Sequence, residues 1–399
     1  MVITGLESLS RDRFRKLKSR KLAVLANQAA INSKYQHLVD LLLSNGIKIS
    51  KIFAPEHGFR GEMQDMDFIA DCKDPYTGIS VKSLYGKDEA SLAPSIEDLK
   101  DIEILLIDLP DIGSRYYTFA QSMIYSMQIA KKAGCKVIIL DRPNPINGEK
   151  VEGAKLLKSC RSFCGYMDTA IRHGLTLGEL AIAANSGFGE GEEALAAINC
   201  ELEIIKVQGW NRLDYLDQTG LPWVYPSPNI PALETAIIYP GSCLFEATEI
   251  SEGRGTTKPL EQFGTPYING QHWAEACLKE NIELKGAILR PISFLPKFQK
   301  HAGKTCFGLQ LHITDRDEFS PVRWSLALIA SAFRLYPNEF QWRKQAFEFV
   351  DKVPAIDLLY GSDEFRKSIE SGIELSAIEN SMQLYEKEFM EDRKTFLLY

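Results

Sequence analysis

Short apolar runs of strand length alternate with helical patterns over the first 150 residues, and this alternation restricts the fold more than any other feature. The strand runs occupy residues 21–26, 47–54, 103–109 and 136–140. The helical patterns occupy residues 35–44 and 117–132. Such an order predicts βαβ units and a mostly parallel sheet that is covered on both faces. We therefore expect an α/β protein.

The remaining chain carries weaker signals of the same kind. Thr176 stands at the start of a predicted helix over 176–184, with Glu179 at the spacing of a capping box. Strands are expected at 204–207 and 309–313, a helix at 322–336, and a charged helical tail from about 360. Four prolines between 222 and 231 exclude regular structure there and indicate a domain junction. We expect two domains, 1–228 and 229–399, because 399 residues exceed one ordinary domain.

Charge and hydropathy exclude several classes of protein. The chain has 46 Lys and Arg against 53 Asp and Glu, so it lacks the basic excess of a nucleic-acid-binding protein. No apolar stretch approaches the roughly 20 residues of a membrane helix. The N-terminus shows no basic region followed by an apolar one. We expect a cytoplasmic protein as the sequence is written, or a periplasmic or secreted one if a leader has been removed.

The eight cysteines do not form a recognisable framework. Only Cys160 and Cys164 are close in sequence, and neither a CxxC motif nor a pair of histidines accompanies them. In a chain of this length, scattered cysteines are typical of buried free thiols rather than of disulfides or zinc ligands. We therefore expect no disulfide framework and no metal site.

Polar side chains follow each of the four predicted N-terminal strands. Asn27 follows the first, Glu56 and His57 the second, Asp111, Arg115 and Tyr116 the third, and Asp141, Arg142 and Asn144 the fourth. Ligands of an open parallel sheet bind at the carboxyl ends of its strands, where such loops converge. Each residue alone can serve as a structural cap, but together they favour a site for a polar ligand.

Glu56 is the first candidate for proton chemistry. It follows Pro55 at a strand end and precedes His57, Gly58 and Phe59, where an apolar neighbour would raise the pKa of its carboxyl group for general-acid catalysis. The alternative is that Glu56 pairs with Arg60 or caps a turn. His57 either orients Glu56, binds a substrate or is a structural histidine.

A second dense cluster of polar residues spans 246–259. It contains Glu246, Glu249, Glu252, Arg254 and Thr256. The spacings of a Walker loop and of a dinucleotide fingerprint are both absent, so the glycines of this loop do not indicate a nucleotide. The composition suits recognition of a hydroxylated, partly anionic molecule, or else a well-capped surface loop. Further candidates are Arg172 and His173 before the helix at 176, and Asn229 in the proline-rich segment.

An ordered series of motifs resembles one known family. The motifs are APEHGFRG at 54–61, SLYG at 83–86, DIGSRY at 111–116, LDRPNP at 140–145, RHG at 172–174, PSPN at 226–229 and SEGRGTT at 251–257. This series resembles the exo-β-N-acetylmuramidase family NamZ, glycoside hydrolase family 171. The resemblance covers nearly the whole chain.

The resemblance implies a Rossmann-like N-terminal domain without a nucleotide or other cofactor, a smaller C-terminal α/β domain, and an active cleft between them. It implies release of β-linked N-acetylmuramic acid (MurNAc) from the non-reducing end of peptidoglycan fragments, with MurNAc–N-acetylglucosamine (MurNAc-GlcNAc) saccharides or muropeptides as partners. Glu56 becomes the catalytic acid. Arg115, Arg142, Arg172 and Arg254 are the candidates for binding the lactyl carboxylate of MurNAc.

A glycosidase ordinarily needs a second group beside its acid. Our hypothesis places Glu249 or Glu252 across the cleft; Glu246, Asp108, Asp111 and the acetamido group of the substrate are the alternatives. The expected substrate-binding residues are Asn27, His57, Asp111, Arg115, Tyr116, Asp141, Arg142, Asn144, Arg172, His173, Asn229, Arg254 and Thr256. Two rival interpretations remain: a non-catalytic muropeptide or amino-sugar binding protein of the same fold, and a nucleotide-dependent enzyme.

Overall fold

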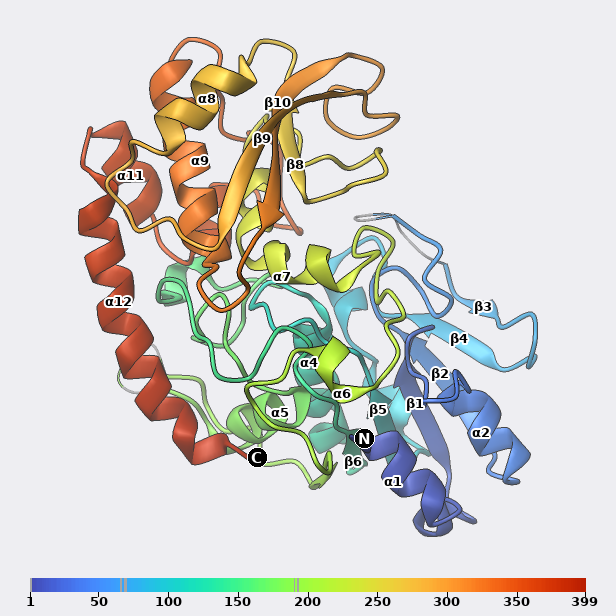
Figure 1. Cartoon of the computed structure of the whole chain (residues 1–399). Coiled ribbons are helices and arrows are strands. Elements are labelled where there is room, and N and C mark those ends of the chain that lie inside the picture. Colours follow the sequence, from blue (N-terminus) through green and yellow to red (C-terminus); the bar gives the residue numbers. More distant parts are fainter. Residues whose placement is uncertain (1, 65–66, 68–69, 190, 192–193) are drawn as a thin grey trace.

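A seven-stranded, mostly parallel sheet forms the larger part of the molecule (Figure 1). The computed structural model describes residues 2–64, 67, 70–189, 191 and 194–399. The strands are β1 (Leu22–Ala26), β2 (Ile49–Ala54), β3 (Cys72–Lys73), β4 (Ser80–Ser83), β5 (Ile104–Asp108), β6 (Lys136–Leu140) and β7 (Leu202–Ile205). Their order is β3-β4-β2-β1-β5-β6-β7, and only β3 pairs antiparallel with its neighbour. The expected α/β class is confirmed.

Both faces of this sheet are buried, which explains why its strands are continuous apolar runs. Side chains of successive strand residues point to opposite faces. Along β1, Ala23 and Leu25 therefore join one hydrophobic cluster and Val24 joins another. The first cluster includes Met123 and Leu180 from two covering helices. The helices of this part are α1 (Gly5–Arg11), α2 (Leu38–Ser44), α3 (Ile96–Leu99), α4 (Phe119–Ala133), α5 (Leu177–Ser186) and α6 (Leu216–Thr219), with 3-10 turns η1 (Arg15–Leu17), η2 (Glu89–Leu92) and η3 (Lys158–Cys160).

The order of the strands reverses between β1 and β5. From β1 the chain proceeds outward through β2 to β4, and then returns to β5 on the other side and continues to β6 and β7. In open α/β sheets, ligands bind beside such a reversal, at the carboxyl ends of the strands. The loops after β1, β2, β5 and β6 meet at this edge, and they carry the polar residues that the sequence singled out.

A smaller C-terminal part stands over that edge (Figure 1). Its antiparallel sheet has the strand order β8-β10-β9. The elements are α7 (Leu233–Ser242), η5 (Cys243–Ala247), β8 (Gln262–Thr265), α8 (Gly270–Cys277), β9 (Ala287–Phe294), β10 (Cys306–Ile313), α9 (Pro321–Leu335), α10 (Ala355–Tyr360), α11 (Glu364–Glu370), α12 (Leu375–Asp392) and η6 (Arg393–Phe396). The long helix α12 runs back along both parts (Figure 1). Its Tyr385 donates a hydrogen bond of 2.7 Å to Asp168 of the N-terminal part.

Most expected elements are present, with ends shifted by a few residues. The capping box of Thr176 and Glu179 is confirmed at the start of α5. No helix or strand occurs between α6 and α7, as the four prolines predicted, and the boundary at 228/229 inside this segment stays a prediction. All eight cysteines are free thiols, and all except Cys72 are buried, as expected. Among the described residues, no helix is long and apolar enough to cross a membrane.

Candidate active site

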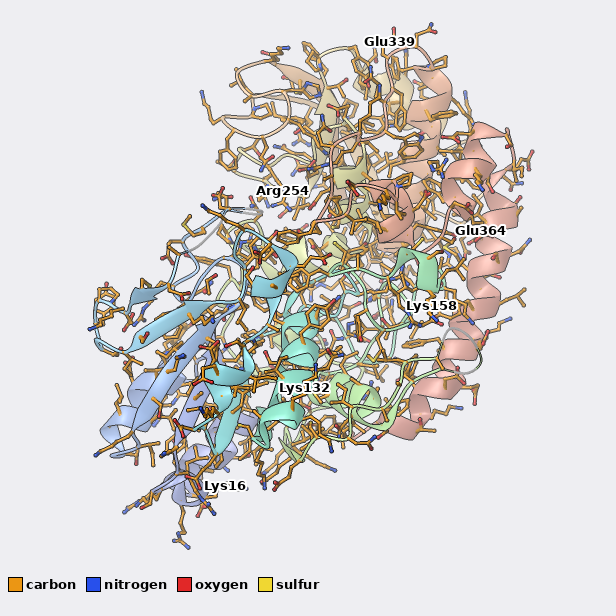
Figure 2. The ribbon with its side chains drawn as sticks, turned by 180° about the vertical axis from the view of Figure 1, so that it is seen from behind. Lys16, Lys132, Lys158, Arg254, Glu339 and Glu364 are labelled. Atoms are coloured by element: carbon orange, nitrogen blue, oxygen red, sulfur yellow. The ribbon has the colours of Figure 1, made fainter. Side chains whose placement is uncertain are left out.

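A pocket of about 510 Å³ lies between the carboxyl edge of the large sheet and the C-terminal part. The N-terminal part contributes Glu56, His57, Tyr116, Tyr117, Thr118, Cys164, Ser227 and Asn229 to its wall. The C-terminal part contributes Tyr239, Cys243, Glu246, Arg254, Phe347 and Glu348. Arg254 lies where the two parts of the molecule meet (Figure 2). The expected cleft between the parts is thus present, and it brings together five of the predicted site residues: Glu56, His57, Tyr116, Asn229 and Arg254.

A sharp turn after β2 delivers Glu56 into this pocket. His57 and Gly58 both have positive φ, 71° and 85°, so the chain reverses directly after Glu56. The hydroxyl of Thr118 donates a hydrogen bond of 2.7 Å to Oε2 of Glu56, whose exposed fraction is 6%. Arg60 binds both carboxylate oxygens of Asp74 at 2.9 and 3.0 Å. Thr118 therefore contacts Glu56, and Asp74 pairs with Arg60.

Three tyrosines form an aromatic wall of the pocket. The ring of Tyr239 meets the rings of Tyr116 and Tyr117 edge-on, at centroid distances of 5.8 and 5.9 Å. Tyr116 also donates its hydroxyl hydrogen to the backbone carbonyl of Pro240 on α7. Burial raises the pKa of all three phenols well above the usual value, so they stay protonated and neutral. The wall therefore offers apolar ring surface without adding charge.

A compact charged cluster surrounds Arg254, which lies in the pocket wall together with Glu246. Arg254 contacts Glu246 at 2.5 Å and Glu252 at 3.2 Å, and Lys300 contacts Glu252 at 2.8 Å. Burial by itself would raise the pKa of Glu252, but the charges of Lys300 and Arg254 lower it below the usual value. Gly255 has a φ of 77°, and a Cβ there would stand 2.7 Å from the backbone of Phe298. Glycine is therefore required beside Arg254 for the loop to approach this closely.

Glu348 reaches the pocket from a tight two-residue hairpin. Phe347 and Val350 exchange two backbone hydrogen bonds of 2.9 Å, and Glu348 and Phe349 between them have φ of 45° and 68°. A residue other than glycine pays roughly 1–2 kcal/mol in this left-handed region. The hydroxyl of Tyr85 donates 2.8 Å to Oε2 of Glu348. Sequence reasoning missed Glu348 because its neighbourhood contains neither a motif nor a strand end.

The remaining predicted arginines are placed elsewhere. Arg115 is buried and donates to the backbone carbonyls of four residues, Ala154, Thr169, Leu359 and Tyr360. Arg172 is fully buried and forms an ion pair of 3.0 Å with Glu152. Arg142 forms a bidentate pair with Asp108, at 2.5 and 2.8 Å. Of the four predicted arginines, only Arg254 belongs to the pocket wall, as far as the described residues show.

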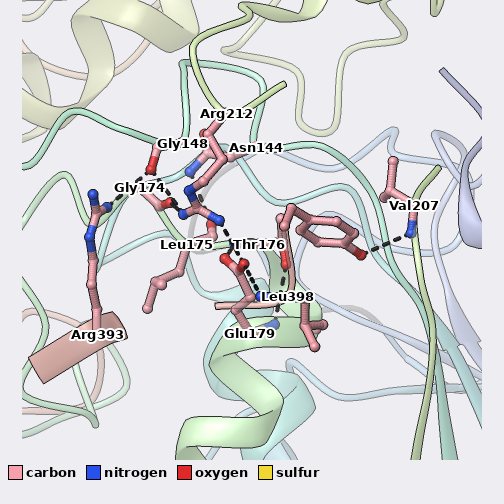
Figure 3. Close-up of polar contacts among 12 residues, drawn as sticks. Asn144, Gly148, Gly174, Leu175, Thr176, Glu179, Val207, Arg212, Arg393 and Leu398 are labelled. Carbon is pink, nitrogen blue, oxygen red and sulfur yellow. Dashed lines mark hydrogen bonds and ion pairs between the residues drawn. The ribbon is translucent and has the colours of Figure 1, made fainter. Parts of the chain in front are cut away.

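Other predicted residues bind the backbone that supports the site. Asn27 donates 2.9 Å to the carbonyl of Pro226, and Asn144 donates 3.0 Å to that of Leu175 (Figure 3). Asp141 accepts hydrogen bonds from Thr176, Gly178 and Tyr399, and burial raises its pKa to about 6. Burial lowers the pKa of His173 to about 3, and its Nδ1 accepts from the backbone of Leu175.

Asp111 and Arg142 line a second cavity of about 560 Å³, together with Pro143 and Trp223. This cavity lies beside the reversal between β1 and β5. The backbone N–H of Gly113 donates 2.7 Å to Asp111, and burial raises the pKa of Asp111 to about 7. The structure therefore separates these two predicted residues from the pocket that holds Glu56.

Some residues of the 246–259 loop line the pocket, and others hold the loop in place. Thr256 donates to the carbonyl of Gly253 and accepts 2.7 Å from Gln262, which fixes the segment that carries Arg254. The backbone of Glu249 binds His301 and Gln341. Within the described part of the chain, the pocket wall includes Glu246 but not Glu249, Glu252 or Thr256. The described residues also contain no group of three or more His, Cys, Asp and Glu arranged to hold a metal ion.

Comparisons with known proteins agree with the fold and with the motif series. Family models for the N-terminal and C-terminal domains of exo-β-N-acetylmuramidase NamZ match residues 22–234 and 237–399. The peptidoglycan β-N-acetylmuramidase NamZ of Bacillus subtilis (strain 168) is 38% identical over 399 residues, which cover 100% of this chain and 91% of that protein. Two DUF1343 family structures from Bacteroides fragilis NCTC 9343 give TM-scores of 0.87 and 0.74 at 29% and 30% identity, with 100% of this chain and 99% of each other chain covered. The chain therefore belongs to the exo-β-N-acetylmuramidase NamZ family.

Proposed function

We propose that this chain is an exo-acting glycoside hydrolase that releases β-linked MurNAc from the non-reducing end of peptidoglycan fragments. The observation that carries this proposal is the position of Glu56, a buried carboxyl group in the wall of a pocket of about 510 Å³. Membership of the NamZ family supports the same activity.

Glu56 is the proposed general acid. In its protonated form it would deliver a proton to the glycosidic oxygen as the bond to the anomeric carbon breaks. The hydrogen bond from Thr118, the residue preceding α4, fixes the orientation of its carboxyl group. A rigid strand end and a helix N-terminus thus hold the acid from two sides, which reduces the entropy lost on reaching the transition state.

Arg254 is the proposed partner of the lactyl carboxylate of MurNAc. Arg254 lies in the pocket wall, and the planar fork of a guanidinium matches the geometry of a carboxylate. The tyrosine wall at Tyr116, Tyr117 and Tyr239 would pack against the sugar ring. His57 and Asn229 supply hydrogen-bonding groups for hydroxyl and acetamido substituents. We propose MurNAc-GlcNAc saccharides as the substrate class.

The direct test uses a MurNAc-GlcNAc disaccharide and mass analysis of the products. The wild-type protein is expected to release free MurNAc, and Glu56→Gln is expected to lower turnover roughly 10²- to 10⁴-fold, the usual contribution of a general acid. Glu339→Gln, at an exposed position far from the pocket, is the matched control (Figure 2). A thermal shift with the disaccharide but no products would establish the non-catalytic binding protein instead.

A further inference from the structure

We propose that Glu348 is the second catalytic carboxylate, which faces the anomeric carbon of the bound sugar while Glu56 faces the leaving oxygen. This inference rests on the proposed hydrolase function. It assigns the second catalytic group to Glu348, where the sequence analysis proposed Glu249 or Glu252. It is carried by the position of Glu348 in the pocket wall and by the unusual turn that places it there.

The turn of residues 347–350 has a backbone that its sequence does not favour. Two-residue hairpin loops with positive φ at both central positions are ordinarily occupied by Asn-Gly or similar pairs. Here Glu348 and Phe349 occupy them, with φ of 45° and 68°. Residues held in this region tend to occur at functional sites, where the surrounding structure maintains the strain. The conformation has a clear consequence here, because it directs the Glu348 side chain into the pocket.

Aromatic packing against the N-terminal part holds this turn in place. The ring of Phe349 meets that of Tyr85 edge-on at 5.7 Å, and Tyr85 in turn lies 6.1 Å from Phe163. Tyr85 is 1% exposed and follows β4 of the large sheet. Its hydroxyl reaches Glu348 at 2.8 Å across 263 residues of sequence. One buried tyrosine therefore joins the two parts of the molecule and fixes the carboxylate at their interface.

The other carboxylate of the pocket wall is less suited to this role. Glu246 accepts a hydrogen bond of 2.5 Å from Arg254, whose guanidinium also contacts Glu252. A cation at that distance offsets the negative charge with which a carboxylate stabilises a developing oxocarbenium ion. Tyr85, which donates to Glu348, is itself neutral, because burial raises the pKa of its hydroxyl far above the usual value. From the place of Glu348 in the pocket wall and the turn that holds it there, we assign Glu348 to the anomeric carbon, and Glu246 to substrate recognition beside Arg254.

The resulting reaction is balanced within the pocket. Glu56 gives its proton to the glycosidic oxygen, the C1–O bond breaks, and its electron pair leaves with the departing sugar. The carboxylate of Glu348 stabilises the positive charge that develops at C1. A water molecule then adds its oxygen to C1 and returns a proton to Glu56. Tyr85 is a positioning residue in this scheme, since it acts through Glu348.

Leaving-group dependence tests the assignment. We would measure kcat for wild type, Glu56→Gln, Glu348→Gln and Glu348→Asn on the 4-nitrophenyl and 2,4-dinitrophenyl β-glycosides of MurNAc. Asparagine tolerates positive φ, so Glu348→Asn preserves the turn. The 2,4-dinitrophenyl leaving group needs little protonation. The kcat of Glu56→Gln, expressed as a fraction of the wild-type kcat, is therefore expected to be at least 10-fold higher on this substrate than on the 4-nitrophenyl glycoside. Both Glu348 variants are expected to lose at least 100-fold on both substrates, while their affinity for MurNAc stays within 3-fold of wild type.

Each other outcome overturns the assignment. Near wild-type kcat in either Glu348 variant would remove Glu348 from the reaction, and restoration of these variants by the better leaving group would place Glu348 at the leaving oxygen. Tyr85→Phe is expected to lower kcat about 10-fold with KM unchanged, and to have no further effect in the Glu348→Gln background. An additive effect would contradict its positioning role. Absence of turnover by the wild type would refute the hydrolase function itself, and is thus distinct from failure of this inference.

Discussion

Substitution of Arg254 by lysine is the most informative perturbation of substrate recognition. Arg254 bridges Glu246 and Glu252 in the charged cluster, and Lys300 supplies the second positive charge of this cluster. A neutral substitution would leave the half-buried Glu246 and the buried Glu252 with one cation, at a cost of about 3–5 kcal/mol in folding stability. Arg254→Lys retains the charge but loses the planar guanidinium that binds a carboxylate in two places.

The expected size of the effect follows from the number of hydrogen bonds lost. A lysine at this position can hold the lactyl carboxylate through one N–H bond where arginine can provide two. A hydrogen bond to a charged group contributes about 1.5–3 kcal/mol, which corresponds to roughly 10- to 150-fold in kcat/KM. The loss applies only to a substrate that carries the carboxylate. A glycoside whose lactyl group is converted to an amide should lose much less.

The assay compares kcat/KM for 4-nitrophenyl β-MurNAc and for its lactyl amide, in wild type and Arg254→Lys. The ratio of kcat/KM for the carboxylate substrate to kcat/KM for its amide should be at least 10-fold lower in Arg254→Lys than in wild type. The melting temperature of the variant should stay close to that of wild type. The reasoning would be refuted if Arg254→Lys reduced both substrates equally, because the residue would then support the pocket rather than recognise the carboxylate.

Three further outcomes follow from the same contacts. Thr118→Val removes the hydrogen bond to Glu56 and should lower kcat about 10-fold with KM unchanged, measured on 4-nitrophenyl β-MurNAc; a change in KM alone would contradict the orienting role. Asp111→Asn should become more stable relative to wild type as pH rises. Burial raises the pKa of Asp111 from 3.8 to about 7, beside His173 at 3.8 Å, so the stability due to its proton is complete below about pH 4 and lost through pH 7. The free energy of unfolding of Asp111→Asn minus that of wild type, measured with urea, should increase by about 3 kcal/mol from pH 5 to pH 8. A difference that does not change with pH would contradict this. Arg115→Met should lower the free energy of unfolding by at least about 3 kcal/mol, because four buried carbonyls lose their donor, and should leave KM unchanged if the protein is assayed below its melting temperature.

The sequence predicted those parts of the fold that depend on local patterns. Strands β1, β5 and β6 are apolar on both faces, so a short hydrophobic run identified each one directly. The helix α7 was missed because Pro240 lies inside it, and proline ordinarily ends a helix. Strand β9 was missed because its alternation is interrupted by Arg290 and Pro291 at successive exposed positions.

The site was predictable only where its residues follow strand ends. Glu56 stands directly after β2, and its position at the carboxyl edge follows from the topology of a parallel sheet. The sequence did not distinguish Arg254 from Arg115 and Arg172, because burial against carbonyls or Glu152 depends on segments distant in the chain. Glu348 was beyond local reasoning for the same reason, since Tyr85 holds it from the other domain.

The direction of cleavage tests the central claim, that the pocket containing Glu56 accepts one terminal MurNAc. Two peptidoglycan tetrasaccharides would be incubated with the protein, one ending in MurNAc and one in GlcNAc at the non-reducing end, and products would be followed over time by mass spectrometry. The structure predicts that the MurNAc-capped chain releases a single MurNAc and leaves a GlcNAc-capped trisaccharide, while the GlcNAc-capped tetrasaccharide stays intact. Release of disaccharides, or cleavage of both chains alike, would contradict the account.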